Sequence, residues 1–435
     1  MAIYFFQGNK DFFLAHQEND DNQKIEIIKS RISEFFNMKN VHFLFGSGTS
    51  CPAIPNMQSL YLKVKKVIDE STEIKPEDKE DFYLIANNNK DNLEEILGVL
   101  YSKREYIKGH IPFVEGSVDY SNCDKLISDI EETIFNEINV LPQGEQLDED
   151  YTKTCSDKND TLINVPNDSD KTNVVLGTYI NFYQKVALRN KDLSRINVFT
   201  TNNDLYNETA LDCLNIHYIN GFNGGLNRYF NPAMFNYTYS KRMDTSIDRF
   251  EPVDDMVYLY KIHGSINWIE DTNKSNSYFD IKEETVPKYD KEKSVLIYPT
   301  PMKQNKSLGS PYSDLFREFQ HKLLEPNGVL FVIGYSFNDE HVNDIIYRAL
   351  ATNSTFNLVI INDIDKGKPI CKVNDSRVFR IWDDDKSKPI HYFDRIVNEL
   401  LPNLDAFKQK DILTEFVKQI KEEKQKQIQQ NNENR

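Results

Sequence analysis

The sequence predicts an α/β fold in which a Rossmann-like, doubly wound and mainly parallel sheet carries a large helical insertion. Short apolar runs have the length of buried strands, and amphipathic helical patterns lie between several of them. Strands that are apolar on both sides indicate a parallel sheet covered by helices on both faces. The predicted strands are VHFLF at 41–45, INVFTT at 196–201, LNIHYI at 214–219, VYLYKI at 257–262, SVLIYP at 294–299, VLFVIG at 329–334 and FNLVII at 356–361.

The pattern divides the chain into three parts. Residues 1–40 are predicted to form an N-terminal helical segment, residues 41–403 the α/β domain, and residues 404–435 a C-terminal helix with a polar tail. Apolar residues recur at helical spacing between 78 and 190, which predicts a helical insertion in the α/β domain. Within it, residues 143–170 hold eight acidic and two basic residues, a composition typical of a solvated loop.

The composition is that of a globular protein and narrows the classes of function. Hydrophobic residues make up 39% of the 435 residues, but no apolar run reaches the roughly 18 residues that a membrane-spanning helix needs. The net charge of −16 opposes broad contact with nucleic-acid phosphates, because such contact requires a Lys/Arg surface. We therefore expect a cytoplasmic protein without membrane contact and without direct nucleic-acid binding.

A glycine turn follows the first predicted strand. Gly46, Ser47, Gly48, Thr49 and Ser50 lie between this strand and an amphipathic helical pattern. Glycines in this position let the backbone approach a pyrophosphate, and the amides that follow can point at it. The turn lacks the third glycine of the GxGxxG pattern, so the alternative interpretation is a tight connection without a ligand.

Polar side chains follow the strand at 196–201. Asn202 and Asp204 come directly after it, at the end where ligands bind in open α/β sheets. An amide and a carboxylate there can hold ribose hydroxyls or a water, as cleavage of an N-glycosidic bond requires. The alternative is an Asn/Asp-rich turn that caps the next helix.

His263 follows the strand at 257–262 and precedes Gly264. An imidazole at a strand end can accept a proton at neutral pH from a ribose hydroxyl or a water. A histidine in this position is more often a hydrogen-bonded structural group. Three strand ends with chemically useful groups in one chain favour the catalytic interpretation.

In this order, the motifs resemble those of the sirtuin (silent information regulator) family. GSGTS with Ile54-Pro55 resembles its GAGxS and GIP loop, TTNND at 200–204 its TQNxD element, and KIHGS at 261–265 its LHGS element. VIGYSF at 332–337 resembles its GTS-type loop, and Ile361-Asn362 its adenosine-side strand end. The resemblance covers 41–60 and 196–385.

The resemblance implies NAD+ as substrate and a set of site residues. His263 would be the general base, and Asn202 would act with it on the nicotinamide ribose. The implied NAD+-binding residues are Gly46, Ser47, Gly48, Ser50, Thr201, Asp204, Gly334, Ser336 and Asn362. The run Asn338-Asp339-Glu340-His341 lies beside this set and is interpreted as a helix cap.

Departures from the family pattern bear on the reaction. Sirtuin deacylases carry a four-cysteine zinc module after the His-Gly strand, whereas residues 270–293 contain no cysteine. We therefore expect no zinc, and water rather than an acyl-lysine as the acceptor. The sequence resembles most the sirtuin-like domains of bacterial anti-phage systems, which degrade NAD+ to nicotinamide and ADP-ribose.

That resemblance also implies partners and leaves alternatives. We expect a homo-oligomer, and either a HerA-type ATPase or a phage-derived component as the activator. One alternative is a subunit that senses NAD+ or ADP-ribose without hydrolysis. The other is an NAD+-dependent deacylase or ADP-ribosyltransferase. A nuclease has the least support, because no metal-binding carboxylate cluster is evident.

Overall fold

The computed structural model describes residues 2–16, 20–110, 120–140, 168–186, 193–243, 249–253, 255–271, 280–290, 294–296 and 310–402. The predicted C-terminal helix and tail lie outside these residues. So does the predicted acidic loop, except for its last three residues, which begin a helix.

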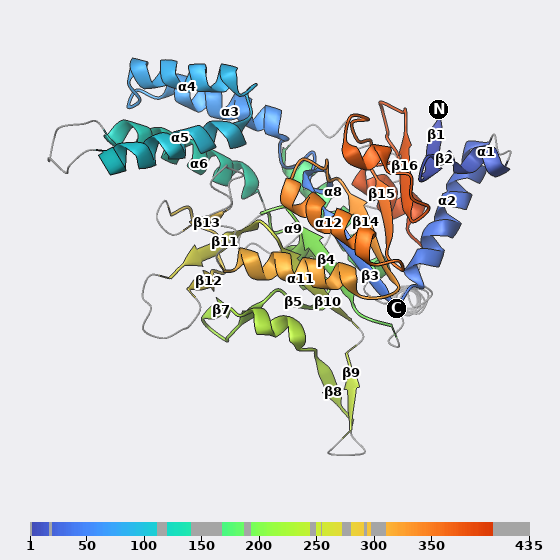
Figure 1. Cartoon of the computed structure of the whole chain (residues 1–435). Helices are drawn as coiled ribbons and strands as arrows, with labels where there is room; N and C mark the ends of the chain where they lie inside the picture. Colours follow the sequence, from blue (N-terminus) through green and yellow to red (C-terminus); the bar gives the residue numbers. More distant parts are fainter. Residues whose placement is uncertain are drawn as a thin grey trace, which may run out of the picture.

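A parallel sheet forms the centre of the molecule (Figure 1). Among the described residues it has nine strands in the order β2-β1-β16-β15-β14-β3-β4-β10-β5. The seven from β16 to β5 run parallel, and β1 and β2 are antiparallel additions at one edge. The strands are β1 (Ile3–Gln7), β2 (Lys10–Asp11), β3 (Asn40–Phe45), β4 (Ile196–Thr200), β5 (His217–Ile219), β10 (Met256–Lys261), β14 (Gly328–Ile333), β15 (Asn357–Ile361) and β16 (Val378–Asp383).

Helices cover both faces of this sheet, because its central strands are apolar on both sides. Phe43 and Phe45 of β3 point into one hydrophobic cluster, whereas Leu44 points into another. Helices α2 (Asp21–Phe36), α8 (Asp168–Val186) and α9 (Tyr206–Cys213) cover the first face, with α13 (Phe393–Arg395) and the π-type turn η5 (Ile396–Leu400). Helices α11 (Tyr312–Leu324) and α12 (Glu340–Thr352) cover the second. The predicted doubly wound α/β fold is confirmed.

The strand order creates a switch point beside β3. The chain passes from β3 to β4 on one side of it, but β14 on the other side continues outward to β15 and β16. In doubly wound sheets, ligands bind beyond the carboxyl ends of the strands at such a point. The loops after β3, β4, β10 and β14 therefore meet at one edge of the sheet.

A helical subdomain lies apart from the sheet (Figure 1). It consists of α3 (Met57–Glu70), α4 (Pro76–Asn88), α5 (Leu93–His110) and α6 (Tyr120–Ile138), which share a hydrophobic cluster. The structure thus differs from the helical insertion predicted at 78–190. The subdomain already begins with α3, and α8 packs on the sheet, because its Tyr179, Phe182 and Tyr183 are fully buried in the main core.

The N-terminal segment contains strands as well as helices. Residues 1–40 are predicted to be helical, but β1 pairs with β16, and the helices among the described residues of this segment are α1 (Phe12–His16) and α2. Ile3 and Phe5 are buried while Tyr4 and Phe6 are half-buried, so the run has the alternation of an edge strand. β1 has only five residues and pairs with a segment far away in the chain, so its alternation is too short to be recognised as a strand from the sequence.

A second, antiparallel sheet lies beyond the end of β10. Among the described residues it has the order β13-β11-β12-β7-β6, formed by β6 (Phe222–Asn223), β7 (Arg228–Phe230), β11 (Gly264–Glu270), β12 (Ile281–Glu283) and β13 (Ser294–Leu296). The prediction that the run at 294–299 belongs to the parallel sheet is wrong for its described residues, since β13 pairs antiparallel with β11. A short apolar run does not reveal its partner strand.

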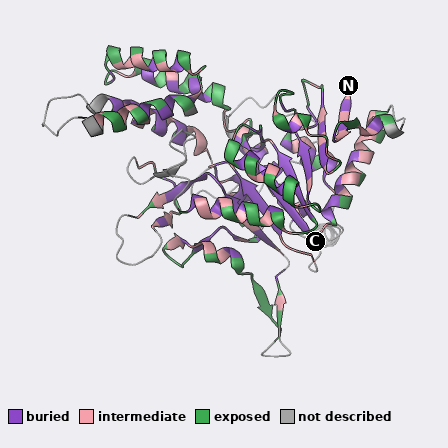
Figure 2. Ribbon diagram, viewed as in Figure 1, coloured by how far each residue is buried: buried purple, intermediate pink, exposed green. Residues whose placement is uncertain are grey.

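The remaining elements are short. They are the 3₁₀ turns η1 (Ser47–Thr49), η3 (Pro232–Asn236) and η4 (Pro369–Lys372), and a hairpin of β8 (Ser240–Arg242) and β9 (Phe250–Pro252) that projects from the body (Figure 1). Helices on the sheet and in the subdomain turn exposed residues outward, while the central strands are buried throughout (Figure 2). No helix within the described residues is long and apolar enough to cross a membrane.

The pairing of β1 with β16 leads to a prediction about stability. Phe5 is 1% exposed and its ring packs against those of Phe12, Phe13 and Phe379. We expect Phe5→Ala to lower the free energy of unfolding by about 3–5 kcal/mol, because it leaves a cavity in the core. Leu14→Ala is the control, since Leu14 is 79% exposed. Denaturant unfolding measures both, and equal midpoints would contradict the role of Phe5.

Candidate active site

The glycine turn after β3 lies against the loop after β14. The Gly46 amide donates to Ile333 O at 3.0 Å, and the Gly48 amide donates to Gly334 O at 3.0 Å. A Cβ on Gly46 would lie 2.5 Å from Gly334 O, and a Cβ on Gly48 would lie 2.7 Å from Gly334 Cα. Gly334 itself has a φ of +65°. All three positions therefore require glycine for backbone contact between the two loops.

This contact gives the glycines a role that the sequence did not reveal. The sequence predicts a close approach to a pyrophosphate, whereas the structure has a close approach to the neighbouring loop. The outer side of the turn remains accessible, because Ser47 and Gly48 are exposed. The turn can thus present its backbone to a ligand on one side while it packs against Gly334 on the other.

Asn202 lies beneath this turn. The two hydrogens of its side-chain Nδ2 are shared among three acceptors, which are Gly46 O at 3.1 Å, Thr49 Oγ1 at 3.1 Å and Ser50 Oγ at 3.0 Å. Its Oδ1 accepts no hydrogen bond from the residues that the structure describes. The amide is therefore oriented through its nitrogen, and its oxygen can accept from a ribose hydroxyl or a water.

Asp204 joins the loop after β4 to the same turn. Ser50 Oγ donates to Asp204 Oδ2 at 2.7 Å, and the Tyr206 amide donates to Asp204 Oδ1 at 3.1 Å. Burial raises the pKa of the Asp204 carboxyl, while Lys261 and the Ser50 hydroxyl oppose that shift. Both carboxylate oxygens are thus engaged by the protein. The bond from the Tyr206 amide forms an Asx turn before α9, but the N-cap residue of this helix is Leu205, whose side chain forms no capping hydrogen bond.

Tyr179 of α8 completes the network around the turn. Its hydroxyl lies 2.7 Å from Thr49 Oγ1 and 3.3 Å from Ser50 Oγ. The pKa of this phenol is raised mainly because the side chain is buried, so the hydroxyl remains neutral. The sequence contains no local sign of this role, because Tyr179 follows the apolar spacing of a helix that packs in the core.

His263 lies at the end of β10 and contacts the loop after β14. Gly264, with a φ of +83°, turns the chain from β10 into β11. The imidazole is nine-tenths buried, and its Nε2 lies 3.0 Å from Asp339 Oδ2. Asn203 Nδ2 donates to His263 O at 2.8 Å, which ties this turn to the loop that carries Asn202.

Asp339 also caps α12, as the sequence predicts for the run 338–341. Its Oδ1 accepts from the His341 amide at 2.9 Å and from the Val342 amide at 3.3 Å. The cap is confirmed, and its second oxygen reaches His263. The sequence alone does not connect Asp339 with the imidazole, because nothing local shows which loop lies opposite His263.

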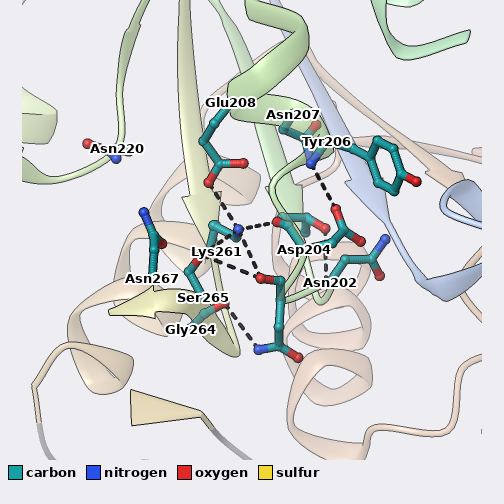
Figure 3. A network of polar contacts seen from close by, with 12 residues as sticks. Asn202, Asp204, Tyr206, Asn207, Glu208, Asn220, Lys261, Gly264, Ser265 and Asn267 are labelled. Carbon is teal, nitrogen blue, oxygen red and sulfur yellow. Dashed lines mark hydrogen bonds and ion pairs between the residues drawn. The ribbon is translucent and has the colours of Figure 1, made fainter. Parts of the chain in front are cut away.

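A buried ion pair lies beside these loops. Lys261 is 1% exposed, and its Nζ lies 3.0 Å from Glu208 Oε1 of α9. The same ammonium donates to Ser265 Oγ at 2.7 Å, to Asn203 O at 3.3 Å and to Asp204 O (Figure 3). Burial raises the pKa of Glu208, and Lys261 opposes this shift. Lys261 thus holds the loop after β4 and the turn after β10 together.

The predicted site residues fall into two groups. Gly46, Ser50, Asn202 and Asp204 contact one another, and Gly48 touches Gly334. Thr201 extends the pairing of β3 and β4, since its amide donates to Phe45 O at 3.0 Å.

The predicted adenosine-side residues lie on the loops after β14 and β15. Ser336 is exposed, and Asn362 Nδ2 donates to Tyr335 O at 3.0 Å, which fixes the loop after β14. Within the described ranges, no three His, Cys, Asp or Glu side chains are grouped as a metal site would need.

Comparison with known proteins finds a match to a family model. A family model described as a SIR2-like domain matches residues 196–373. This segment runs from the first residue of β4 to one residue past the end of η4. The matched segment contains Asn202, His263, Ser336 and Asn362, but not the glycine turn. None of the curated proteins compared with the chain matches it. A SIR2-like domain indicates an NAD-consuming enzyme.

The loop contact predicts an effect of Gly334→Ala. An alanine at a φ of +65° is strained, and its Cβ would lie 2.7 Å from the Thr49 amide nitrogen. We expect the free energy of unfolding to fall by about 1–3 kcal/mol, because a left-handed conformation is costly for alanine. Gly225→Ala is the matched control, since no atom lies within 4 Å of its built Cβ. Thermal unfolding compares the two, and equal stabilities would contradict the tight contact.

The buried ion pair predicts a double-mutant effect. Lys261→Met leaves the Glu208 carboxylate buried without its cation, so we expect a loss of about 3–5 kcal/mol in the free energy of unfolding. Lys261→Met with Glu208→Met removes both charges and should recover part of this loss. Denaturant unfolding of both single variants and the double variant measures the coupling. Strictly additive losses would show that the two side chains do not interact.

Proposed function

We propose that this protein is an NAD+ glycohydrolase that cleaves the bond between nicotinamide and ribose. The observation that carries the proposal is the meeting of Asn202 and the glycine turn, with His263 beside them, at the carboxyl edge of one parallel sheet. The SIR2-like match over two of these three segments supports NAD+ as the substrate.

The proposed reaction assigns roles to His263 and to Asn202 Oδ1. The C1′–N bond breaks, its electron pair goes to the nicotinamide nitrogen, and the ribose passes through an oxocarbenium-like state. A water then adds to C1′ and loses a proton to His263, which acts as the general base. Asn202 Oδ1 orients the water or a ribose hydroxyl, since its amide nitrogen is held by the turn.

Water is proposed as the acceptor on the basis of the cysteines. They are Cys51, Cys123, Cys155, Cys213 and Cys371, so none lies between the His-Gly turn and the loop after β14. The four-cysteine module of sirtuin deacylases therefore has no counterpart at that place in the sequence. This favours hydrolysis over transfer to an acyl-lysine.

The biological setting is proposed from the resemblance of the motifs. Depletion of NAD+ would make the protein an effector in bacterial anti-phage defence, and such an activity requires a trigger. We propose a homo-oligomer, activated either by a HerA-type ATPase or by a phage component. The helical subdomain α3–α6 supplies surface that the parallel sheet does not need, which is compatible with contacts of this kind.

Nicotinamide release tests the assignment. We expect Asn202→Ala and His263→Ala each to reduce the rate of nicotinamide release from NAD+ by about 10²–10⁴-fold, because each removes a group that acts on the ribose or the water. His217→Ala and Asn227→Ala are matched controls, since both side chains are exposed and lie in other parts of the chain.

Variants that release nicotinamide as fast as the parent would refute the assigned site. Consumption of an acyl-lysine peptide without free hydrolysis would favour a deacylase. Tight binding of NAD+ or ADP-ribose without turnover, even with the partner ATPase present, would favour a sensing subunit.

A further inference from the structure

The carboxylate of Asp339 serves two elements at once. Its Oδ1 accepts two amide hydrogens at the N-terminus of α12, and its Oδ2 lies 3.0 Å from His263 Nε2. Each oxygen thus has a different partner. A helix N-terminus favours a negatively charged cap, so the carboxylate that faces the imidazole is an acceptor.

The loop around Asp339 is held in place by its own contacts. The single hydroxyl hydrogen of Tyr335 is shared between two acceptors, Asp339 O at 3.1 Å and Asn343 Oδ1 at 3.0 Å from Oη. Asn343 Nδ2 donates to Phe337 O at 3.1 Å. Tyr335 and Phe337 are buried, and Asn343 is 9% exposed. The carboxylate is therefore presented to His263 from a rigid support, as a positioning group requires.

We propose that Asp339 is a positioning residue that fixes the tautomer of His263. A carboxylate oxygen 3.0 Å from Nε2 favours the neutral tautomer that carries its proton on Nε2, which leaves the lone pair on Nδ1. This inference rests on the function proposed above, in which His263 is the general base. In the base step, the O–H bond of the water or hydroxyl breaks and an N–H bond forms at Nδ1. The resulting imidazolium is stabilised by the Asp339 carboxylate, which keeps its charge.

Asp339→Asn separates this role from the helix cap. An asparagine has one oxygen, which continues to cap α12, because asparagine is as good a cap as aspartate. Its amide nitrogen then faces His263 and donates to Nε2, so the imidazole proton is forced onto Nδ1. We expect kcat for nicotinamide release to fall by at least about 100-fold with little change in KM, since the base is then in the wrong tautomer.

Two further variants complete the design. Asp339→Ser retains a capping side chain but is too short to reach the imidazole, so the tautomer should become mixed and kcat should fall. Glu340→Gln removes one negative charge at the next, exposed position and should leave kcat as in the parent. Thermal unfolding of all variants checks that α12 remains capped.

The tautomer itself is measured by nitrogen-15 NMR of histidine-labelled full-length protein, and His263→Ala identifies the signal among the 8 histidines. We expect Nε2–H in the parent and Nδ1–H in Asp339→Asn. Nδ1–H in the parent, the same tautomer in both, or a parent-like or higher kcat in Asp339→Asn would overturn the inference. A parent that releases no nicotinamide would overturn the proposed function instead, because the NMR measurement needs no NAD+.

Discussion

The contact between the glycine turn and the loop after β14 is the constraint on which the site depends. Gly46, Gly48 and Gly334 allow two backbones to approach within distances that no side chain tolerates. This contact lies where β3 and β14 are neighbours, at the switch point of the sheet. It brings the loop that carries Asp339 next to the turn that orients Asn202. The functional groups are thus positioned by backbone packing before any ligand contact.

The sequence predicted the sheet well because its central strands are buried on both sides. Their continuous apolar runs and terminal polar groups are local signals, and Asn202 and His263 are found from them. The edge strand β1 and the strand β13 were missed or misplaced, because their pairing depends on segments far away in the chain. Amphipathic spacing identified helices, but it could not show that α8 packs on the sheet while α3 belongs to the subdomain.

Contacts between segments far apart in the chain also account for the parts of the site that cannot be predicted from the sequence. The sequence predicts Asp339 as a cap, which is a local role, whereas its contact with His263 joins a strand end to a helix N-terminus 76 residues further along the chain. Lys261 stands in an apolar strand beside His263, and only the fold reveals Glu208 as its counter-ion. Tyr179 has the spacing of a core residue and is buried, yet its hydroxyl reaches the glycine turn. Long-range partners of polar groups leave no pattern in a single sequence.

The pairing of β1 with β16 has a consequence for the order of folding during synthesis. Tyr4 lies opposite Trp382, so β1, which is made before the other strands of the sheet, has its partner β16 only after the parallel strands between them have been translated. At ribosomal rates this delay is on the order of tens of seconds. During that time the apolar side of β1 and the edge of the sheet are both uncovered, and exposed apolar surface and unpaired strand edges are the features that make partly folded chains prone to aggregate.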